Sequence, residues 1–139
     1  MDEQEVRNAC LDLIERSQIV IVGTVNTDGF PEIRAMLNME HDGLREFWFS
    51  TNTSSRKIAQ LKANPKGCVY YVDSEAFRGV TLTGTFEILQ DKESRQRLWR
   101  EGFEQYYPLG VDDPDYSVLH FTATQAEHYH GLKTVRFDV

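Results

Sequence analysis

Apolar residues recur every three or four positions near the start of the chain, a spacing typical of a helix with one buried face. The pattern predicts a helix over residues 3–17 that covers one side or end of a sheet. The residues of this apolar stripe are Val6, Ala9, Cys10, Leu13 and Ile14.

The following stretch changes to the short β-branched and apolar runs that are typical of strands. Residues 18–25 form one such run, and the turn sequence Asn26-Thr27-Asp28-Gly29 leads into a second strand over residues 31–40. Asp42-Gly43 predicts another tight turn, and a third strand follows over residues 45–51.

The second turn also predicts a register. A two-residue loop at Asp42-Gly43 would pair His41 with Leu44 and, further along the ladder, Arg34 with Thr51. Directly opposed residues share one face of a sheet, so Arg34 is expected beside the segment that follows Thr51. The expectation depends on the loop length, because a slip of one residue would turn Arg34 to the other face.

The second half of the chain contains further strand patterns, over residues 67–72 and 78–88, in which Gly79 and Gly84 indicate close backbone approach. Asp91 is a suitable cap for a helix over residues 91–104. The remaining predicted segments are a proline- and glycine-containing loop over residues 106–116 with packed aromatics, strands over 117–124 and 127–129, and a last strand or intersubunit tail over 132–139.

Antiparallel strands joined by tight turns, with helices between them, predict an α+β fold built on a closed or partly closed barrel. The length of 139 residues is typical of a single domain, so one domain over residues 1–139 is expected. The longest aliphatic run is too short to cross a bilayer, and the acidic start is unlike a secretory signal. The expected location is therefore the cytoplasm.

The formal net charge of -7 argues against nucleic acid or an anionic membrane surface as a partner. Cys10 and Cys68 lack metal-binding or disulfide spacing and are expected to be small core residues. His128 and His130, together with His120 or Asp113, form a possible metal set, but too few ligands are fixed for zinc, and a partly exposed strand face is preferred.

Residues 47–72 invert this acidic balance, because they contain Arg56, Lys57, Lys62 and Lys66 and no acidic residue. Thr53 or Ser54 is expected to cap a helix whose first turn then contains two cations, against the helix dipole. A bound anion would remove the conflict, and free N–H groups, hydroxyls and cations suit a phosphate. The alternative is an ordinary surface helix with solvated lysines.

The order of short motifs resembles that of the FMN-binding split-barrel family, which includes pyridoxamine 5'-phosphate oxidase. The early motifs are Gly23-Thr24-Val25, Arg34-Ala35-Met36, Phe49-Ser50-Thr51-Asn52, Ser55-Arg56-Lys57 and Asn64-Pro65. Later motifs resemble the general stress protein branch, and they are Gly84 to Glu87, Leu98-Trp99, Tyr107-Pro108 and Ala126-Glu127 before Tyr129.

The resemblance implies an antiparallel split β-barrel that binds FMN and forms a homodimer with flavin at the interface. It implies that the phosphate is held by Arg34, Ser55, Arg56 and Lys57. It also implies that the flavin ring is bordered by Ala35, Met36 and Leu37 and by Ser50 and Thr51.

Two departures weaken the expectation that pyridoxamine phosphate is the substrate. Gly79 stands where the vitamin-processing oxidases have a glutamine for the flavin, and residues 131–139 lack their substrate-binding Arg and His pattern.

Two functions follow from the resemblance. The preferred one is a flavin-dependent oxidoreductase that moves a hydride between a reduced nicotinamide, or a similar donor, and a small acceptor. The other is a flavin-binding module for sensing, storage or stress response without turnover. No general acid or base in the sequence separates them. Hydrolase chemistry has no support, because Ser54 and Ser55 lack identifiable His and Asp partners.

Overall fold

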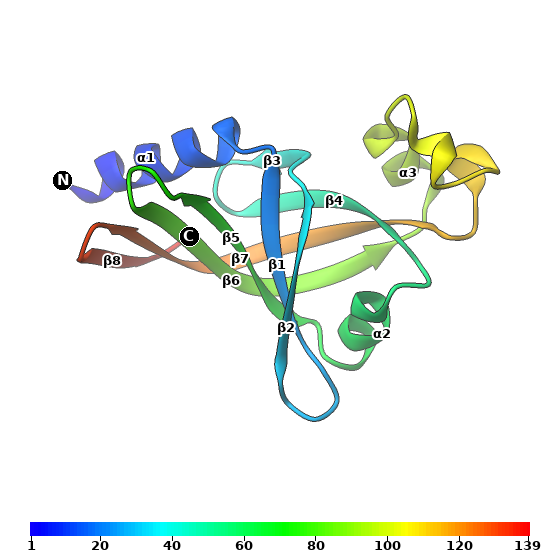
Figure 1. Ribbon diagram of the computed structural model, residues 1–139, viewed down its shortest axis with the longest axis horizontal. Coiled ribbons are helices and arrows are strands. Elements are labelled where there is room, and N and C mark those ends of the chain that lie inside the picture. Colours follow the sequence, from blue (N-terminus) through cyan, green and yellow to red (C-terminus); the bar gives the residue numbers. More distant parts are fainter.

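The computed structural model describes residues 1–139, which form a curled antiparallel sheet with helices around it (Figure 1). The strands are β1 (Ile19–Val25), β2 (Pro31–Leu37), β3 (Glu40–Asp42), β4 (Glu46–Asn52), β5 (Lys66–Asp73), β6 (Arg78–Leu89), β7 (Tyr116–His130) and β8 (Lys133–Asp138). The helices are α1 (Glu3–Arg16), α2 (Arg56–Ala63) and α3 (Lys92–Leu98), with short 3-10 helices η1 (Phe103–Gln105) and η2 (Gly110–Asp112).

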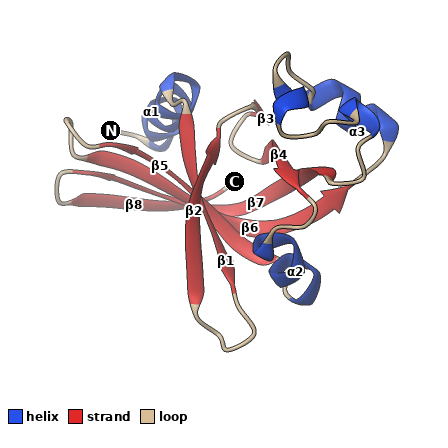
Figure 2. Ribbon diagram, turned by 45° about the vertical axis from the view of Figure 1, so that its right-hand side comes forward, coloured by secondary structure: helices blue, strands red, loops and turns tan.

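Hydrogen bonding orders the strands β2-β1-β5-β6-β7-β4-β3, and β8 pairs with β7. Every paired ladder is antiparallel. Figure 2 shows α1 over one end of the curled sheet and α2 and α3 toward the other. The predicted α+β class with an antiparallel split β-barrel is therefore confirmed.

The main core fills the inside of the curl, where alternate strand residues point inward. Its largest fully buried side chains are aromatic and pack with ring centroids 4.6 to 6.5 Å apart. Burial of this apolar surface is the main force that holds the strands in one curled layer. The aromatic residues in these contacts are Phe47, Phe49, Tyr71, Phe86 and Phe121.

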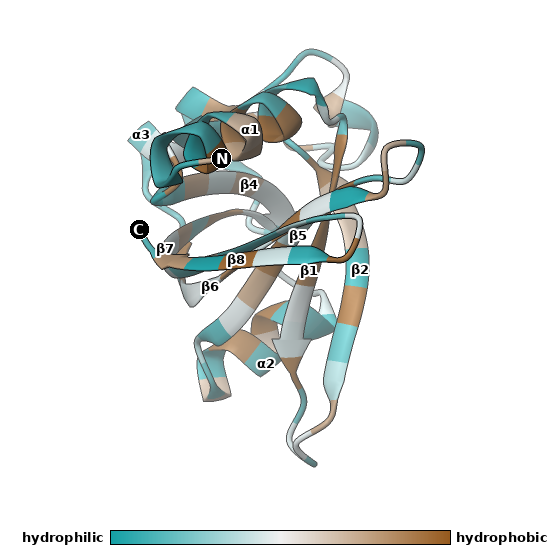
Figure 3. Ribbon diagram, turned by 90° about the vertical axis from the view of Figure 1, so that its left-hand side faces the viewer, coloured by the Kyte–Doolittle hydropathy of each residue, from teal (hydrophilic) through white to brown (hydrophobic).

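Helix α1 closes one end of this core, as the apolar stripe predicts. Asp2 caps the helix: its side chain accepts from the Glu5 backbone N–H, and the Glu5 side chain accepts from the Asp2 N–H in return. Figure 3 shows hydrophobic and hydrophilic residues on different sides of this helix. No helix in the structure combines the length and the apolar character required to cross a membrane.

A second, smaller core lies under α3 and the two 3-10 helices. Leu98, Tyr107, Tyr116 and Val118 are buried there, and the Trp99 ring meets Tyr116 edge-on at 5.3 Å between centroids. This packing confirms the expectation for Tyr107 and Tyr116, whereas Tyr106 in the same loop is mostly exposed.

The predicted register of the second hairpin is wrong. Asp42 lies opposite Glu46, so the loop has three residues, and β2 pairs with β1, where Arg34 lies opposite Val22 and not Thr51. The extra residue is Leu44, which is buried in the core, and burial of a leucine outweighs the preference for a two-residue turn.

Asn38 explains why the predicted strand over residues 31–40 divides into β2 and β3. Its side-chain amide donates to the carbonyl oxygens of Ile14 at 2.7 Å and Ser17 at 2.8 Å. Both carbonyls lie at the end of α1, where helical hydrogen bonding stops, and that of Ile14 also accepts from the Ser17 N–H at 3.3 Å. Strand β2 therefore ends at Leu37, and the next residue, Asn38, binds the end of α1 with its side chain.

Two further boundaries differ from the predictions, one of two alternatives for the end of the chain is confirmed, and one cysteine is less buried than expected. The helix expected over residues 91–104 ends at Leu98, and Gly102 has a positive φ of 96°, which starts a new turn. Strands expected over 117–124 and 127–129 form one strand with a bulge opposite Gly84, where a Cβ atom would lie 1.9 Å from the Thr122 carbonyl oxygen. Residues 133–138 form the expected last strand, β8, which pairs with β7 of the same chain. Cys10 is buried, but Cys68 is only half-buried.

Candidate functional site

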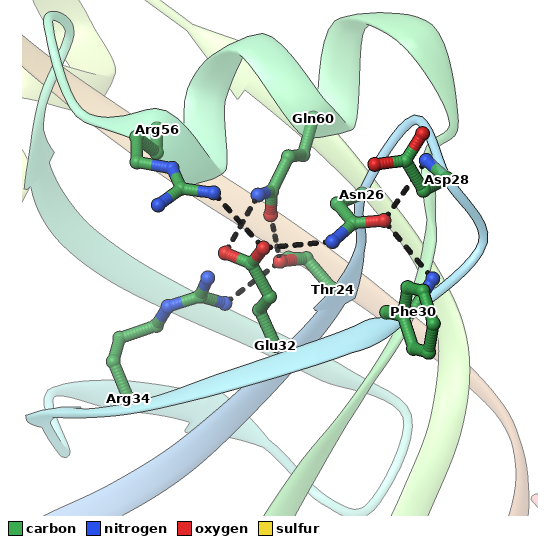
Figure 4. A network of polar contacts seen from close by, with 8 residues as sticks. All are labelled: Thr24, Asn26, Asp28, Phe30, Glu32, Arg34, Arg56 and Gln60. Carbon is green, nitrogen blue, oxygen red and sulfur yellow. Dashed lines mark hydrogen bonds and ion pairs between the residues drawn. The ribbon is translucent and has the colours of Figure 1, made fainter.

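Arg34 reaches the start of α2 by crossing β1. Residues 32, 34 and 36 of β2 point inward, and the Arg34 guanidinium donates from Nη1 to Thr24 Oγ1 at 2.8 Å and to the Val22 carbonyl oxygen at 3.2 Å. The structure therefore brings Arg34 to the side of the sheet where α2 begins, through the β1–β2 pairing and not through the predicted pairing with β4 (Figure 4).

Helix α2 begins at Arg56, with Ser55 as its N-cap in place of the predicted Thr53 or Ser54. Thr53 is engaged elsewhere, because its hydroxyl contacts Ser117 Oγ at 2.6 Å and donates to the Pro114 carbonyl oxygen. No side chain caps the first turn of α2, so its backbone N–H groups lack a side-chain acceptor.

Lys57 is the second half-buried cation of this region. Its Nζ donates to Thr51 Oγ1 at 2.8 Å and to Ser55 Oγ at 3.2 Å. Burial, with a smaller effect of the positive Arg34, lowers the pKa of Lys57 below its ordinary value. An ammonium held only by neutral hydroxyls in a desolvated position favours a nearby anion.

Glu32 lies between Arg34 and Arg56 and was not predicted from the sequence (Figure 4). Its carboxylate accepts from Arg56 Nη2, Gln60 Nε2 and Asn26 Nδ2, each at 2.9 Å. We define the cationic seat as Arg34, Arg56 and Lys57 together with this carboxylate.

A cavity of about 220 Å³ opens beside Lys57, between β2, β4 and the segment around η1. Six residues predicted to contact the cofactor line it: Ala35, Met36, Leu37, Ser50, Thr51 and Lys57. The other three, Arg34, Ser55 and Arg56, lie outside the cavity wall, although Ser55 contacts Lys57 directly. The structure thus divides the predicted residues between a cavity and an adjoining cationic cluster.

The remaining residues that line the cavity were not among those predicted to contact the cofactor. These are Met39, Asn52, Phe103, Tyr106 and Tyr107. Tyr107 is buried against Trp99 and Tyr116, whereas Tyr106 is 66% exposed. The adjacent tyrosines in an otherwise polar loop were the available signal, but only tertiary packing shows that they lie beside β2 and β4.

A family model described as Pyridoxamine 5'-phosphate oxidase matches residues 6–130, which is most of the chain. The chain belongs to the pyridoxamine 5'-phosphate oxidase family. The resemblance inferred from the short motifs is therefore confirmed.

Solved structures place the chain close to the general stress proteins of this family. A protein from Clostridium acetobutylicum, related to general stress protein 26 of B. subtilis, is 48% identical, with 100% of this chain and 97% of that chain covered and a TM-score of 0.89. General stress protein 26 from Bacillus anthracis is 17% identical, with 96% and 99% covered and a TM-score of 0.78, and shows the shared fold alone.

The chain also matches curated oxidases of the family over part of their length. A pyridoxine/pyridoxamine 5'-phosphate oxidase from Porphyromonas gingivalis is 39% identical over 71 residues, covering 51% of this chain and 33% of the relative. One from Aeromonas hydrophila is 32% identical over 101 residues, covering 68% and 47%. The chain thus spans between about a third and a half of the length of the curated relatives that it matches.

Gly79, the departure noted against the vitamin-processing oxidases of the family, has a structural reason in this chain. A Cβ atom at Gly79 would lie 2.7 Å from Cε1 of Tyr129, so the tyrosine ring fills the space that a side chain would need. A larger residue at position 79 would require Tyr129 to move.

No group of three or more His, Cys, Asp or Glu side chains in the structure could hold a metal ion. His128 is buried, with burial lowering its pKa, and so it does not lie on the partly exposed strand face that the sequence suggested. His130 is exposed at the end of β7.

Proposed function

We propose that this member of the pyridoxamine 5'-phosphate oxidase family binds FMN, with the phosphate in the cationic seat. The observation that carries the proposal is the continuity of the seat with the cavity, since Lys57 belongs to both. A phosphate monoester has a charge of roughly -1.5 to -2 at pH 7, which suits half-buried cations that have only hydroxyl and carbonyl partners.

The residues of the chain fit the parts of this cofactor. Arg34, Arg56 and Lys57 would hold the phosphate, with Ser55 and the first N–H groups of α2 as further donors. The backbone of Ala35 to Leu37 and the side chains of Ser50 and Thr51 would border the flavin ring. When bound, the flavin supplies hydride transfer, and the protein supplies orientation and exclusion of water.

We further propose a flavin-dependent oxidoreductase that transfers a hydride from a reduced nicotinamide to an unidentified small substrate. Hydride transfer requires no general base, and the cavity wall contains no carboxylate and no imidazole. The same observation favours a second candidate, a flavin-binding or stress-response module without turnover. Both candidates bind FMN, but only in the oxidoreductase would the bound flavin be reduced by a nicotinamide donor.

A homodimer is part of the proposal. Strand β2 is an edge strand whose outward side chains include Ile33 and Leu37, and Ile19 lies opposite Leu37 on β1. All three are exposed apolar residues, and Leu37 also lines the cavity. Contiguous apolar surface of this kind is typical of an interface. Each subunit would be a single domain over residues 1–139. A second copy of the chain would cover this surface and close the cavity.

We also propose that the protein works in the cytoplasm, where its two free cysteines would stay reduced.

The decisive experiment is a visible spectrum of the purified protein after incubation with FMN and removal of free flavin, followed by anaerobic NADH or NADPH. A retained flavin spectrum that bleaches supports the oxidoreductase, and one that does not bleach supports the binding module. A protein that retains no flavin contradicts both candidates. Size-exclusion chromatography with light scattering tests the dimer, and a monomer in the flavin-bound form would contradict it.

A further inference from the structure

Glu32 places a negative charge inside a site that is otherwise built for an anion. Its carboxylate is hydrogen-bonded to Arg56 at 2.9 Å and interacts electrostatically with Arg34, and Arg34 in turn interacts with Lys57. Its side chain is 27% exposed, whereas that of Arg56, its ion-pair partner, is 79% exposed. The partner is therefore free to turn toward solvent or a ligand, and the carboxylate is not.

Neutral amides hold the carboxylate in place independently of Arg56. Gln60 Nε2 donates to Oε1 of Glu32, and Asn26 Nδ2 donates to Oε2. Gln60 is itself buried, and its carbonyl oxygen accepts from the hydroxyl of Thr24, which in turn accepts from Arg34. This continuous chain of hydrogen bonds is visible in Figure 4.

The hydrogen bonds from Asn26 and Gln60, with smaller contributions from Arg56 and Arg34, lower the pKa of Glu32. The carboxylate therefore stays ionised when a phosphate arrives at neutral pH. A dianionic phosphate shared between the same cations would meet a fixed like charge at short range.

We propose that Glu32 is a resident counter-anion that lowers the affinity of the cationic seat for the phosphate of its ligand. The inference rests on the proposed function and deepens it, because it assigns to Glu32 the control of how tightly the phosphomonoester is held. With Glu32 present, the seat has a net charge of about +2, equal and opposite to one phosphomonoester dianion. Without it, the seat would have an unbalanced third charge.

The repulsion is large enough to measure. A single charge about 6 Å from a dianion, in a water-like dielectric, changes an equilibrium constant by about tenfold. The opposing effect, loss of orientation of Arg56, is small because an ion pair with so exposed a partner contributes little. Removal of the carboxylate is therefore expected to tighten binding.

The test compares FMN with riboflavin, which lacks the phosphate, in titrations of the full chain followed by flavin fluorescence. Glu32→Gln is expected to lower the Kd for FMN about five- to tenfold and to leave the Kd for riboflavin within about twofold. Glu3→Gln is the matched control: Glu3 on α1 is also ion-paired with one arginine, Arg7 at 3.0 Å, and its change in net charge is the same. This control should alter neither Kd.

A decrease in FMN affinity, or no change, in Glu32→Gln would overturn the inference, since Glu32 would then orient Arg56 or lie outside the field of the phosphate. If Glu32→Gln does not fold, Glu32→Ala takes its place, and failure of both to fold would assign Glu32 to the fold and refute the proposal. Wild-type protein that binds no flavin would refute the proposed function itself, which is a separate result.

Discussion

The cationic seat and the end of α3 both contain several arginines, but the partners of these cations differ. Arg95, Arg97 and Arg100 lie within six residues of sequence, a denser cluster than the seat. Arg97 donates to Glu40 at 2.7 Å and stacks over the Trp48 ring at 4.5 Å, and Arg100 lies 3.6 Å from the same carboxylate. These two cations are about half exposed and already paired.

In the seat, Arg34 and Lys57 are more deeply buried and bind only hydroxyl and carbonyl oxygens. Desolvation makes such cations costly until an anion binds, whereas Arg97 and Arg100 are already paired with Glu40. Arg34 and Lys57 are therefore distinguished from Arg97 and Arg100 by the partners and the burial of the cations, and not by the density of positive charge along the chain.

The largest expected effect is that of Arg34→Ala. A charged hydrogen bond lost from a half-buried position costs about 1.5 to 3 kcal/mol, so FMN affinity should fall by about ten- to a hundredfold. Riboflavin affinity should change by less than about threefold, because Arg34 does not line the cavity proposed for the ring. Both constants are measured by fluorescence titration.

Arg97→Ala is the matched control at α3. It removes a guanidinium of equal charge that is bound to a carboxylate, so FMN affinity should stay within about twofold of the parent. If the two variants weakened FMN binding equally, net charge alone would explain the result, and the distinction between the two clusters would be wrong.

The second prediction concerns pH and Lys57. Phosphate binding favours the ammonium form, and the lowered pKa means that the free protein loses this form at a lower pH than an ordinary lysine does. FMN affinity should therefore decrease between about pH 7 and pH 10, by up to about tenfold, while the phosphate itself stays dianionic. Titrations across this range measure the effect.

Lys57→Arg is the control for this pH dependence, because a guanidinium stays charged throughout the range. The variant should bind FMN with a nearly constant affinity over the same interval. A wild-type affinity that is constant with pH would show that Lys57 does not contact the phosphate.

The sequence predicted the elements of the fold well wherever periodicity and turn residues act locally. The apolar stripe of α1, the strands around residues 18–25 and 67–72 and the turn at Asn26 to Gly29 follow from patterns within a few residues. It failed at Leu44 and Asn38, where burial in the core and the completion of a distant helix end decided the loop length. These are tertiary effects that no local pattern contains.

The candidate site shows the same division. The motif resemblance selected residues of β2, β4 and α2 that the structure places around one cavity and its adjoining seat. Arg34 lies beside the start of α2, as expected. It does so because β2 pairs with β1, and not through the predicted pairing with Thr51. Glu32 was not predicted, because no pattern within β2 shows that its carboxylate lies between Arg34 and Arg56.

The smallest effect is expected for Arg56→Ala, and it sharpens the comparison because Arg56 resembles the arginines of α3 more than it resembles Arg34. Its side chain is 79% exposed and ion-paired with Glu32 at 2.9 Å. An exposed pair contributes about 0 to 1 kcal/mol, so FMN affinity should fall by only about two- to fivefold. A loss as large as that of Arg34→Ala would mean that Arg56 turns from Glu32 onto the phosphate and becomes buried by it. Titration with FMN measures the size of the loss, and titration with riboflavin, which lacks the phosphate, shows whether the loss depends on that group.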